Sequence, residues 1–254
     1  MSRNRNYTEE SSISTIEGRN SVLEALKAEH PINKLLIQKG ESTGSIKQIT
    51  AIAREKRIVI QEADKQYLDS LSETRAHQGV IALVSPVDYS SVDDILNNAE
   101  RRNEKPFIII CDELNDPNNL GSIIRTADAV GAHGVIIPKR RSVSVNATVS
   151  KVSAGALEYI PVARVANIAQ TIDLLKASGV WIAGADMDGD KAFYENDLKG
   201  AIALVVGSEG YGISRLVKEK CDFIVRIPMA GKISSLNAGV AAGILMYEIF
   251  RQRH

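Results

Sequence analysis

The feature that most constrains this sequence is a repeated alternation of short apolar runs with helical stretches along its second half. Parallel strands need long crossover connections, usually helices, so this order predicts a parallel sheet with helices on both faces. In such sheets ligands bind beyond the carboxyl ends of the strands, which makes the segments after the strands the candidate site. The expected strands are Phe107–Cys111, Val135–Pro138, Val180–Ala185, Ile202–Val206 and Phe223–Ile227.

A smaller α/β unit is expected in the first half of the chain. From Ile32 to about Val84, apolar runs that suit strands alternate with helical stretches such as Ser45–Lys56. A proline and a serine cluster at 85–91 suit a connection, and Val92–Arg102 is expected to be helical. These breaks divide the chain into a disordered tail at 1–14, a small domain at 15–86, a linker and leading helix at 87–105, and a larger domain at 106–254.

Composition and charge narrow the possible classes of protein. A hydrophobic content of 44% in 254 residues excludes general disorder, and the helical stretch Ala238–Met246 is too short and too rich in glycine to span a bilayer. The amino terminus has no apolar stretch typical of a secretion signal, so we expect a cytoplasmic protein without a membrane association. Because 31 basic residues balance 31 acidic ones, any contact with nucleic acid must be local.

The first candidate segment, residues 112–138, follows the strand Phe107–Cys111 and combines a helix start with an apolar stripe. Asp116-Pro117-Asn118 is typical of a loop that caps a helix, and Gly131 is a plausible stop. Arg125 lies nearly opposite the stripe, so it faces solvent, a cleft or another subunit. Asn119 is either a simple N-cap or a site residue. The residues of the stripe are Leu120, Ile123, Ile124, Ala127 and Val130.

The second candidate segment, residues 204–214, is a buried strand that breaks into glycines. Gly207, Gly210 and Gly212 allow a backbone to approach closely or to adopt positive φ. Their spacing matches neither the dinucleotide fingerprint nor a phosphate-binding P-loop. Glu209 among these glycines could accept hydrogen bonds or hold a cationic partner, although a surface glutamate is an equal alternative.

The third candidate segment, residues 227–250, passes from a strand through an irregular loop into a helix. Ser234 or Ser235 can cap that helix, and Ser235 and Asn237 stand where polar side chains either cap or reach into a site. The helix is expected to pack closely against the sheet or a second copy of the chain. Its small residues are Ala238, Gly239, Ala241, Ala242 and Gly243.

Neither metal chemistry nor cysteine chemistry is indicated. Asp186, Asp188 and Asp190 have the spacing of a calcium loop, but a lysine and an aspartate occupy the positions that need glycine and glutamate. We therefore expect no metal. Cys111 and Cys221 adjoin apolar runs and are expected to be buried, reduced thiols.

Together the three segments closely resemble the motifs of the SpoU (TrmH-like) family of RNA ribose methyltransferases. The resemblance covers about residues 106–253 and rests on the patterns NxxxxxR, GSEGxG and IPMxGxxxSLN in this order. Residues from about 17 to 85, near whose start the sequence IEGRNSVLEAL lies, are similar to the small RNA-binding domain that precedes the catalytic domain in many members. The subgroup that the sequence resembles most modifies guanosines of large-subunit ribosomal RNA.

The resemblance implies a C-terminal trefoil knot, a homodimer and S-adenosylmethionine as the methyl donor. It implies that the loops near Gly207 and at 227–236 hold a bent donor, with backbone groups of Gly207, Ile227 and Leu236 at its adenosine end. It also implies that Arg125 of one chain completes the site of the other. The residues that match the catalytic positions of the family are Asn119, Arg125, Glu209, Ser235 and Asn237.

The expected reaction is methyl transfer to a ribose 2'-hydroxyl, in which positioning contributes much of the acceleration. None of the three motifs contains a histidine that could remove the proton, and a guanidinium stays protonated in proteins. We therefore expect Arg125 to orient the RNA phosphate and the hydroxyl and to stabilise developing oxyanion charge, and leave the proton acceptor unassigned. Ser235 and Asn237 would shape the site, and Glu209 would position Arg125 or its own loop.

RNA is expected to contact the small domain and the basic patch of Lys139, Arg140 and Arg141, although a solvated surface is the usual role of such a cluster.

Three alternative functions remain open. The first is methylation of transfer RNA by the same chemistry, and the second is a non-catalytic RNA-binding or ribosome-assembly protein on the same fold. The third, a nucleotide-dependent oxidoreductase, lacks the required glycine spacing.

Overall fold

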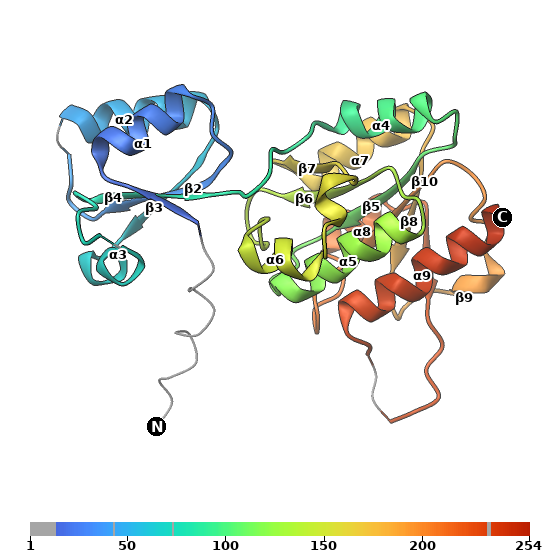
Figure 1. Cartoon of the computed structure of the whole chain (residues 1–254). Coiled ribbons are helices and arrows are strands. Elements are labelled where there is room, and N and C mark those ends of the chain that lie inside the picture. Colours follow the sequence, from blue (N-terminus) through green and yellow to red (C-terminus); the bar gives the residue numbers. More distant parts are fainter. Residues whose placement is uncertain (1–13, 43, 73, 233–234) are drawn as a thin grey trace. The chain divides into compact units, whose positions relative to one another are not determined.

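The computed structural model describes residues 14–42, 44–72, 74–232 and 235–254 (Figure 1). The disordered tail predicted at 1–14 lies outside this part of the chain, except for Ser14. The described residues form two compact units. The first reaches to Asp88 and includes the segment Val145–Thr148, and the second comprises Tyr89–Ser144 and Val149–His254.

The first unit is a four-stranded sheet in the order β1-β4-β2-β3, in which β2 and β3 are parallel and the other pairs antiparallel. Its short first strand was not predicted. The strands are β1 (Thr15–Glu17), β2 (Ile32–Gln38), β3 (Val59–Ala63) and β4 (Val80–Val84), and the helices are α1 (Arg19–Lys27), α2 (Gly44–Glu55) and α3 (Lys65–Leu71).

Alternation along β2 explains how this sheet holds helices on both faces. Successive side chains of a strand point to opposite faces. Leu35 and Ile37 belong to the apolar cluster that includes α1 and α2, whereas Leu36 between them packs with Leu68 and Leu71 of α3. Both faces are therefore covered, and Leu35 and Leu36 are at most 1% exposed.

The second unit is a seven-stranded parallel sheet in the order β7-β6-β5-β10-β8-β11-β9. The five strands predicted here are present, with bounds that differ by at most one residue, and β7 and β9 were missed. The strands are β5 (Phe107–Cys111), β6 (Gly134–Pro138), β7 (Val162–Val165), β8 (Trp181–Ala185), β9 (Lys191–Ala192), β10 (Ile202–Val206) and β11 (Phe223–Arg226).

Helices cover both faces of this sheet (Figure 1). Residues of α4, α7 and α8 share one apolar cluster with Ile108 and Ile110 of β5, while α5 packs against β6 and α9 against β10 and α5. The predicted α/β class is confirmed. In the sheet β10 lies between the earlier strands β5 and β8, and this order β5-β10-β8-β11 is consistent with the implied knot. The helices are α4 (Val92–Arg101), α5 (Pro117–Ala129), α6 (Ala147–Val152), α7 (Ile168–Ala177), α8 (Arg215–Lys220) and α9 (Ala238–Arg253), with 3-10 turns η2 (Ala156–Glu158) and η3 (Phe193–Glu195).

The central strand β5 supplies much of the core. All five of its residues are at most 1% exposed, and burying one isoleucine side chain contributes about 1.5–3 kcal/mol to the free energy of folding.

No helix in the described ranges is long and apolar enough to cross a membrane.

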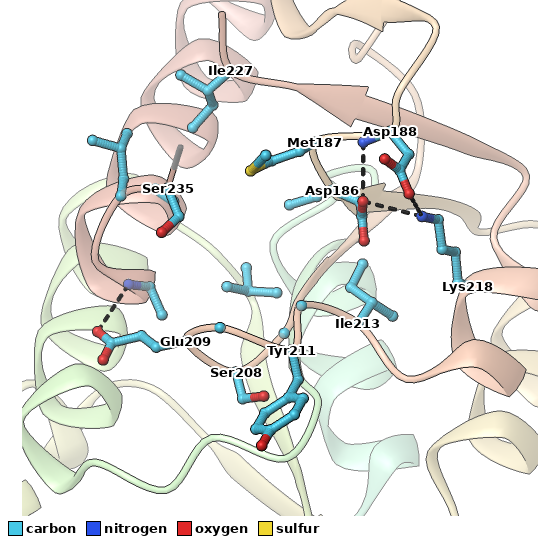
Figure 2. Close-up of a pocket in the computed structure, with 18 of the residues that line it drawn as sticks. Asp186, Met187, Asp188, Ser208, Glu209, Tyr211, Ile213, Lys218, Ile227 and Ser235 are labelled. Carbon is cyan, nitrogen blue, oxygen red and sulfur yellow. Dashed lines mark hydrogen bonds and ion pairs between the residues drawn. The ribbon is translucent and has the colours of Figure 1, made fainter. Parts of the chain in front are cut away.

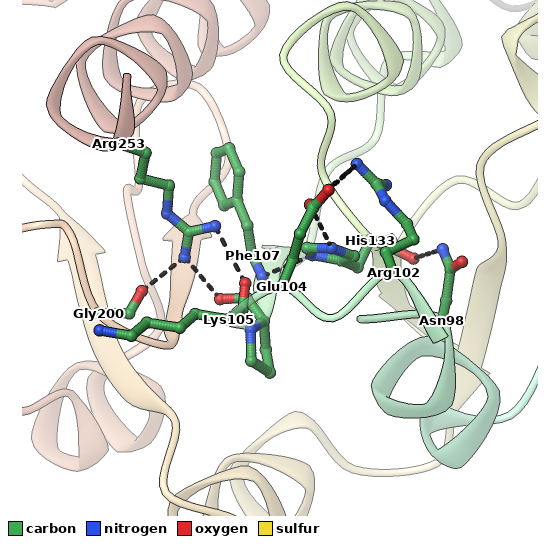
Figure 3. Close-up of polar contacts among 9 residues, drawn as sticks. Asn98, Arg102, Glu104, Lys105, Phe107, His133, Gly200 and Arg253 are labelled. Atoms are coloured by element: carbon green, nitrogen blue, oxygen red, sulfur yellow. Dashed lines mark hydrogen bonds and ion pairs between the residues drawn. The ribbon is translucent and has the colours of Figure 1, made fainter. Parts of the chain in front are cut away.

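Arg253, near the end of α9, anchors this helix to the amino edge of the sheet (Figure 3). Its guanidinium donates to the carbonyl oxygens of Lys105 at 3.1 Å, Pro106 at 2.8 Å and Gly200, and lies 5.0 Å from the centre of the Phe107 ring. Because these groups begin or precede β5 and β10, the carboxyl end of α9 is fixed to the two central strands. The amino end of α9, which follows Asn237, lies at the opposite edge of the sheet, where these strands end.

Candidate functional site

Four strands of the larger unit end together at one edge of the sheet. The pairing places Cys111 of β5 beside Val206 of β10, Val206 beside Ala185 of β8, and Ala185 beside Val225 of β11. Since all these strands are parallel, the segments that follow them converge, as the general rule for such sheets predicts.

A pocket of about 680 Å³ opens at this edge (Figure 2). The apolar residues that line it include Val206, Ile213 and Val225, together with Leu245 of α9. A cavity of this size with a few polar groups suits a small organic ligand. The predicted site residues that line it are Gly207, Glu209, Ile227, Ser235 and Leu236.

Gly207 is required by the close approach of two backbone segments. Ser208 and Gly212 exchange two backbone hydrogen bonds of 3.0 and 2.9 Å, which closes the loop between them. A Cβ atom on Gly207 would lie 2.0 Å from the carbonyl carbon of Gly212. No side chain fits at this position without a shift of the backbone that lines the pocket. Gly210 and Gly212 have φ of +85° and +65°, which favours glycine at both positions.

Three predicted residues from three different segments form one hydrogen-bonded group. Asn119 Nδ2 donates to Glu209 Oε1 at 2.9 Å, and Asn237 Nδ2 donates to Asn119 Oδ1 at 2.8 Å and also to Glu209 Oε1. The backbone N–H of Ala238 donates to the same carboxylate oxygen at 3.3 Å. These residues are up to 118 positions apart in sequence, and their side chains join α5, the loop after β10 and the start of α9.

The structure shows which of these residues cap a helix. Asp116 is the N-cap of α5 and accepts from Asn118 N at 2.8 Å, so Asn119 lies inside the helix, 5% exposed, and is not the cap. Asn237 caps α9, because its Oδ1 accepts from Val240 N at 3.2 Å, and its Nδ2 also joins the hydrogen-bonded group described above. Ser235 lines the pocket without capping α9, and Ser234 lies outside the described residues.

Arg125 stands apart from this group within one chain. The predicted stripe of α5 is confirmed, since its five residues are at most 4% exposed, and Arg125 is exposed on the other side of the helix. It forms no hydrogen bond or ion pair with the residues that the structure describes. Of the two expected roles of Glu209, positioning Arg125 or its own loop, a contact with Arg125 is not seen within the described part of one chain, where Glu209 Oε1 accepts from Asn119 and Asn237.

The basic patch Lys139–Arg141 follows β6, which is the neighbour of β5 in the sheet. It therefore lies along the same edge as the pocket, although none of its residues lines the pocket. Arg140 and Arg141 are exposed, and Arg141 forms a long ion pair of 3.6 Å with Glu113.

Sequence reasoning missed two acidic side chains of the site. Asp112, 4% exposed, follows β5 and accepts from Ser214 N at 2.7 Å, which fastens the end of the glycine loop. Asp186 follows β8 and was considered only as a metal ligand, whereas its carboxylate pairs with Lys218 of α8 at 3.0 Å. Their positions directly after strands are the signal that could have identified them.

In the part of the chain that the structure describes, the site offers neither a reactive thiol nor a group of side chains that could hold a metal ion. Burial raises the pKa of the Cys111 thiol to about 12, so it is protonated at neutral pH. Within the described ranges no group of histidine, cysteine and carboxylate side chains could hold a metal ion.

Two family models match the chain. The model described as the SpoU rRNA Methylase family covers residues 106–247, and one described as RNA 2'-O ribose methyltransferase substrate binding covers residues 15–90. A Bacillus subtilis (strain 168) protein, YacO, named as a TrmH family tRNA/rRNA methyltransferase, is 50% identical over 93% of this chain and 95% of its own length. A Staphylococcus aureus (strain MSSA476) protein of the same description is 48% identical over 94% of this chain and 96% of its own.

Solved structures of RNA methyltransferases also match the chain. The SpoU methyltransferase AviRb from Streptomyces viridochromogenes, solved in complex with the cofactor AdoMet, is 28% identical with a TM-score of 0.61, and the match covers 98% of this chain and 94% of that one. An AdoMet-bound rRNA methyltransferase from Sinorhizobium meliloti is 26% identical with a TM-score of 0.57, covering 96% and 88%.

Proposed function

The chain belongs to the SpoU family of S-adenosylmethionine-dependent RNA methyltransferases, and we propose that it methylates the ribose 2'-hydroxyl of a guanosine in large-subunit ribosomal RNA. The observation that carries the proposed site is the group of Asn119, Glu209 and Asn237 beside the pocket. Transfer RNA is the competing substrate, because the similar Bacillus protein is named for both RNA classes. We also propose a cytoplasmic location, which is consistent with a substrate of this kind.

The pocket residues fit S-adenosylmethionine. The volume of about 680 Å³ and the apolar lining residues suit the adenosine part, and Gly207, Ile227 and Leu236 line the pocket. We assign these three residues to the adenosine end. The bound donor supplies a methyl group on a sulfonium, which is an activated leaving group.

The polar residues of this chain then have distinct roles. Glu209 holds Asn119 and Asn237 in place, and this carboxylate fixes the start of α9 through Ala238 N. Ser235 shapes the pocket wall. Arg125 orients the RNA phosphate and the hydroxyl and stabilises the oxyanion that develops as the proton leaves. A guanidinium remains protonated, so Arg125 is not the proton acceptor.

A homodimer explains why Arg125 lies apart from the pocket of its own chain. On α9, which packs beside α5, three apolar side chains at helical spacing remain uncovered: Val240, Ile244 and Tyr247 are 52%, 36% and 53% exposed. An apolar stripe of this kind suits burial against a second copy. We propose that this face pairs two chains, so that Arg125 of one reaches the pocket of the other.

The substrate is tested by mapping 2'-O-methyl groups in RNA from cells with and without the protein. We expect one guanosine of large-subunit ribosomal RNA to lose its methyl group, and the purified protein with S-adenosylmethionine to restore it. Loss confined to transfer RNA would replace the proposed substrate. Failure to bind the donor in calorimetry would support a non-catalytic RNA-binding protein instead.

Neutralising the basic patch should weaken RNA binding at every sequence and flatten its salt dependence. For Arg140→Gln with Arg141→Gln, the slope of log affinity against log salt should fall by about 0.7–0.9 per lost phosphate contact. The measurement is binding of unmodified ribosomal RNA at several salt concentrations. A matched double variant, Arg101→Gln with Lys105→Gln, removes two exposed charges before β5 and should keep the wild-type slope. Equal slopes in both variants would remove the patch from the RNA interface.

A further inference from the structure

The wall of the pocket opposite Glu209 and Ser235 carries a carboxylate that the proposed mechanism does not use. Asp186 directly follows β8, and its backbone N–H donates to Val225 O at 3.1 Å, which fixes the residue against β11. Its side chain is only 15% exposed and points into the pocket (Figure 2).

The two oxygens of the Asp186 carboxylate differ in their hydrogen-bond partners. Oδ1 accepts from Asp188 N at 3.0 Å and pairs with Lys218 Nζ at 3.0 Å. Oδ2 accepts no hydrogen bond from the described part of the chain, and it lies against the glycine loop, where a Cβ atom on Gly212 would approach it to 3.1 Å. The locked oxygen sets the orientation of the carboxylate, and the other is left as an acceptor for a ligand.

The ammonium of Lys218 is shared between two carboxylates. Lys218 also pairs with Asp188 Oδ2 at 3.0 Å, and these hydrogen bonds to Asp188 and Asp186 raise the pKa of Lys218, so it is charged at neutral pH. A hydroxyl adds no charge to this group of two carboxylates and one ammonium, and it can donate to the free oxygen Oδ2.

The ligand chemistry identifies this hydroxyl. In S-adenosylmethionine the neutral hydroxyls belong to the ribose, which joins the adenine to the sulfonium, and a carboxylate after a strand is a well-suited acceptor for them. We propose that Asp186 binds a ribose hydroxyl of the methyl donor and thereby positions its adenosine part. The inference rests on the proposed placement of the adenosine end near Gly207, Ile227 and Leu236.

The experiment is calorimetry on the full chain with S-adenosylhomocysteine and its 2'-deoxy and 3'-deoxy analogues. A hydrogen bond to a carboxylate predicts that wild type binds at least one deoxy analogue about 10- to 100-fold more weakly than the parent compound. Asp186→Ala should bind the parent weaker by a similar factor and should lose this discrimination. It should also bind 5'-deoxy-5'-methylthioadenosine more weakly, since that compound keeps the ribose but lacks the amino acid.

Asp188→Ala is the matched control. It removes the neighbouring carboxylate of the same Lys218, its side chain is 83% exposed, and it should keep both affinity and discrimination. Three results would overturn this inference but not the proposed function. The first is equal affinity of wild type for all three compounds, and the second is discrimination between them that persists in Asp186→Ala. The third is an affinity that Asp186→Ala loses for S-adenosylhomocysteine but keeps for 5'-deoxy-5'-methylthioadenosine. No binding of S-adenosylhomocysteine by wild type would overturn the proposed function as well.

Discussion

Replacing Arg125 by alanine is expected to lower the single-turnover rate of methylation about 10²- to 10³-fold at saturating RNA, with little change in S-adenosylhomocysteine binding. The loss of one charged donor aimed at a developing oxyanion has an effect of this size. The affinity for the donor should be retained, because Arg125 is exposed on α5 and does not line the pocket of its own chain. Rapid-quench kinetics and calorimetry measure the two quantities separately.

Arg125→Lys separates charge from geometry. A lysine keeps the positive charge but loses the planar array of donors, so we expect partial recovery of RNA binding and a rate still well below wild type. Arg101→Ala, which removes an exposed arginine at the end of α4, should leave the rate unchanged. An unaltered rate for Arg125→Lys at saturating RNA would exclude a direct role of the guanidinium in the chemical step.

Replacing Gly207 by alanine is expected to weaken S-adenosylhomocysteine binding by about 100-fold or more. The added Cβ would meet the carbonyl carbon and oxygen of Gly212 at 2.0 and 2.1 Å, distances that only a backbone shift can relieve. Overpacking of this kind costs about 1–3 kcal/mol even where flexible side chains can give way, and here the obstacle is backbone. The shift would open the Ser208–Gly212 bridge and deform the pocket.

The control for this variant is Gly200→Ala, just before the same strand. A Cβ atom on Gly200 would meet nothing within 4 Å, so affinity and melting temperature should stay close to wild type. Wild-type affinity in Gly207→Ala would show that the loop is not part of the binding site.

The two variants together test whether the site is shared between subunits. In a mixed dimer of an Arg125→Ala chain and a Gly207→Ala chain, one pocket is intact and the only intact arginine is on the other subunit. If Arg125 acts across the interface, this dimer recovers up to half of the wild-type activity, although the homodimer of each variant has very low activity. If Arg125 acts within its own chain, the mixture stays inactive.

Prediction from sequence succeeded where the local pattern was unambiguous. The apolar runs of β5 and β10 are long enough, and bounded clearly enough, to be assigned as buried strands, and the stripe of α5 placed Arg125 on the exposed side. The missed strands had weak patterns, since β9 has two residues, β1 has three and Arg164 interrupts β7. Short strands are formed by pairing with neighbours, and a local window does not contain those neighbours.

Local chemistry was thus enough to establish the strand–helix alternation, the glycine loop and the polar residue types after the strands, because these depend on residues close together in the chain. Tertiary structure decided which of those residues act together. Asn119 and Asn237 both look like helix caps in sequence, and only the parallel sheet brings them to Glu209. Asp186 looked like part of a failed metal site until α8 placed Lys218 beside it, since a carboxylate takes its role from the partner that folding provides.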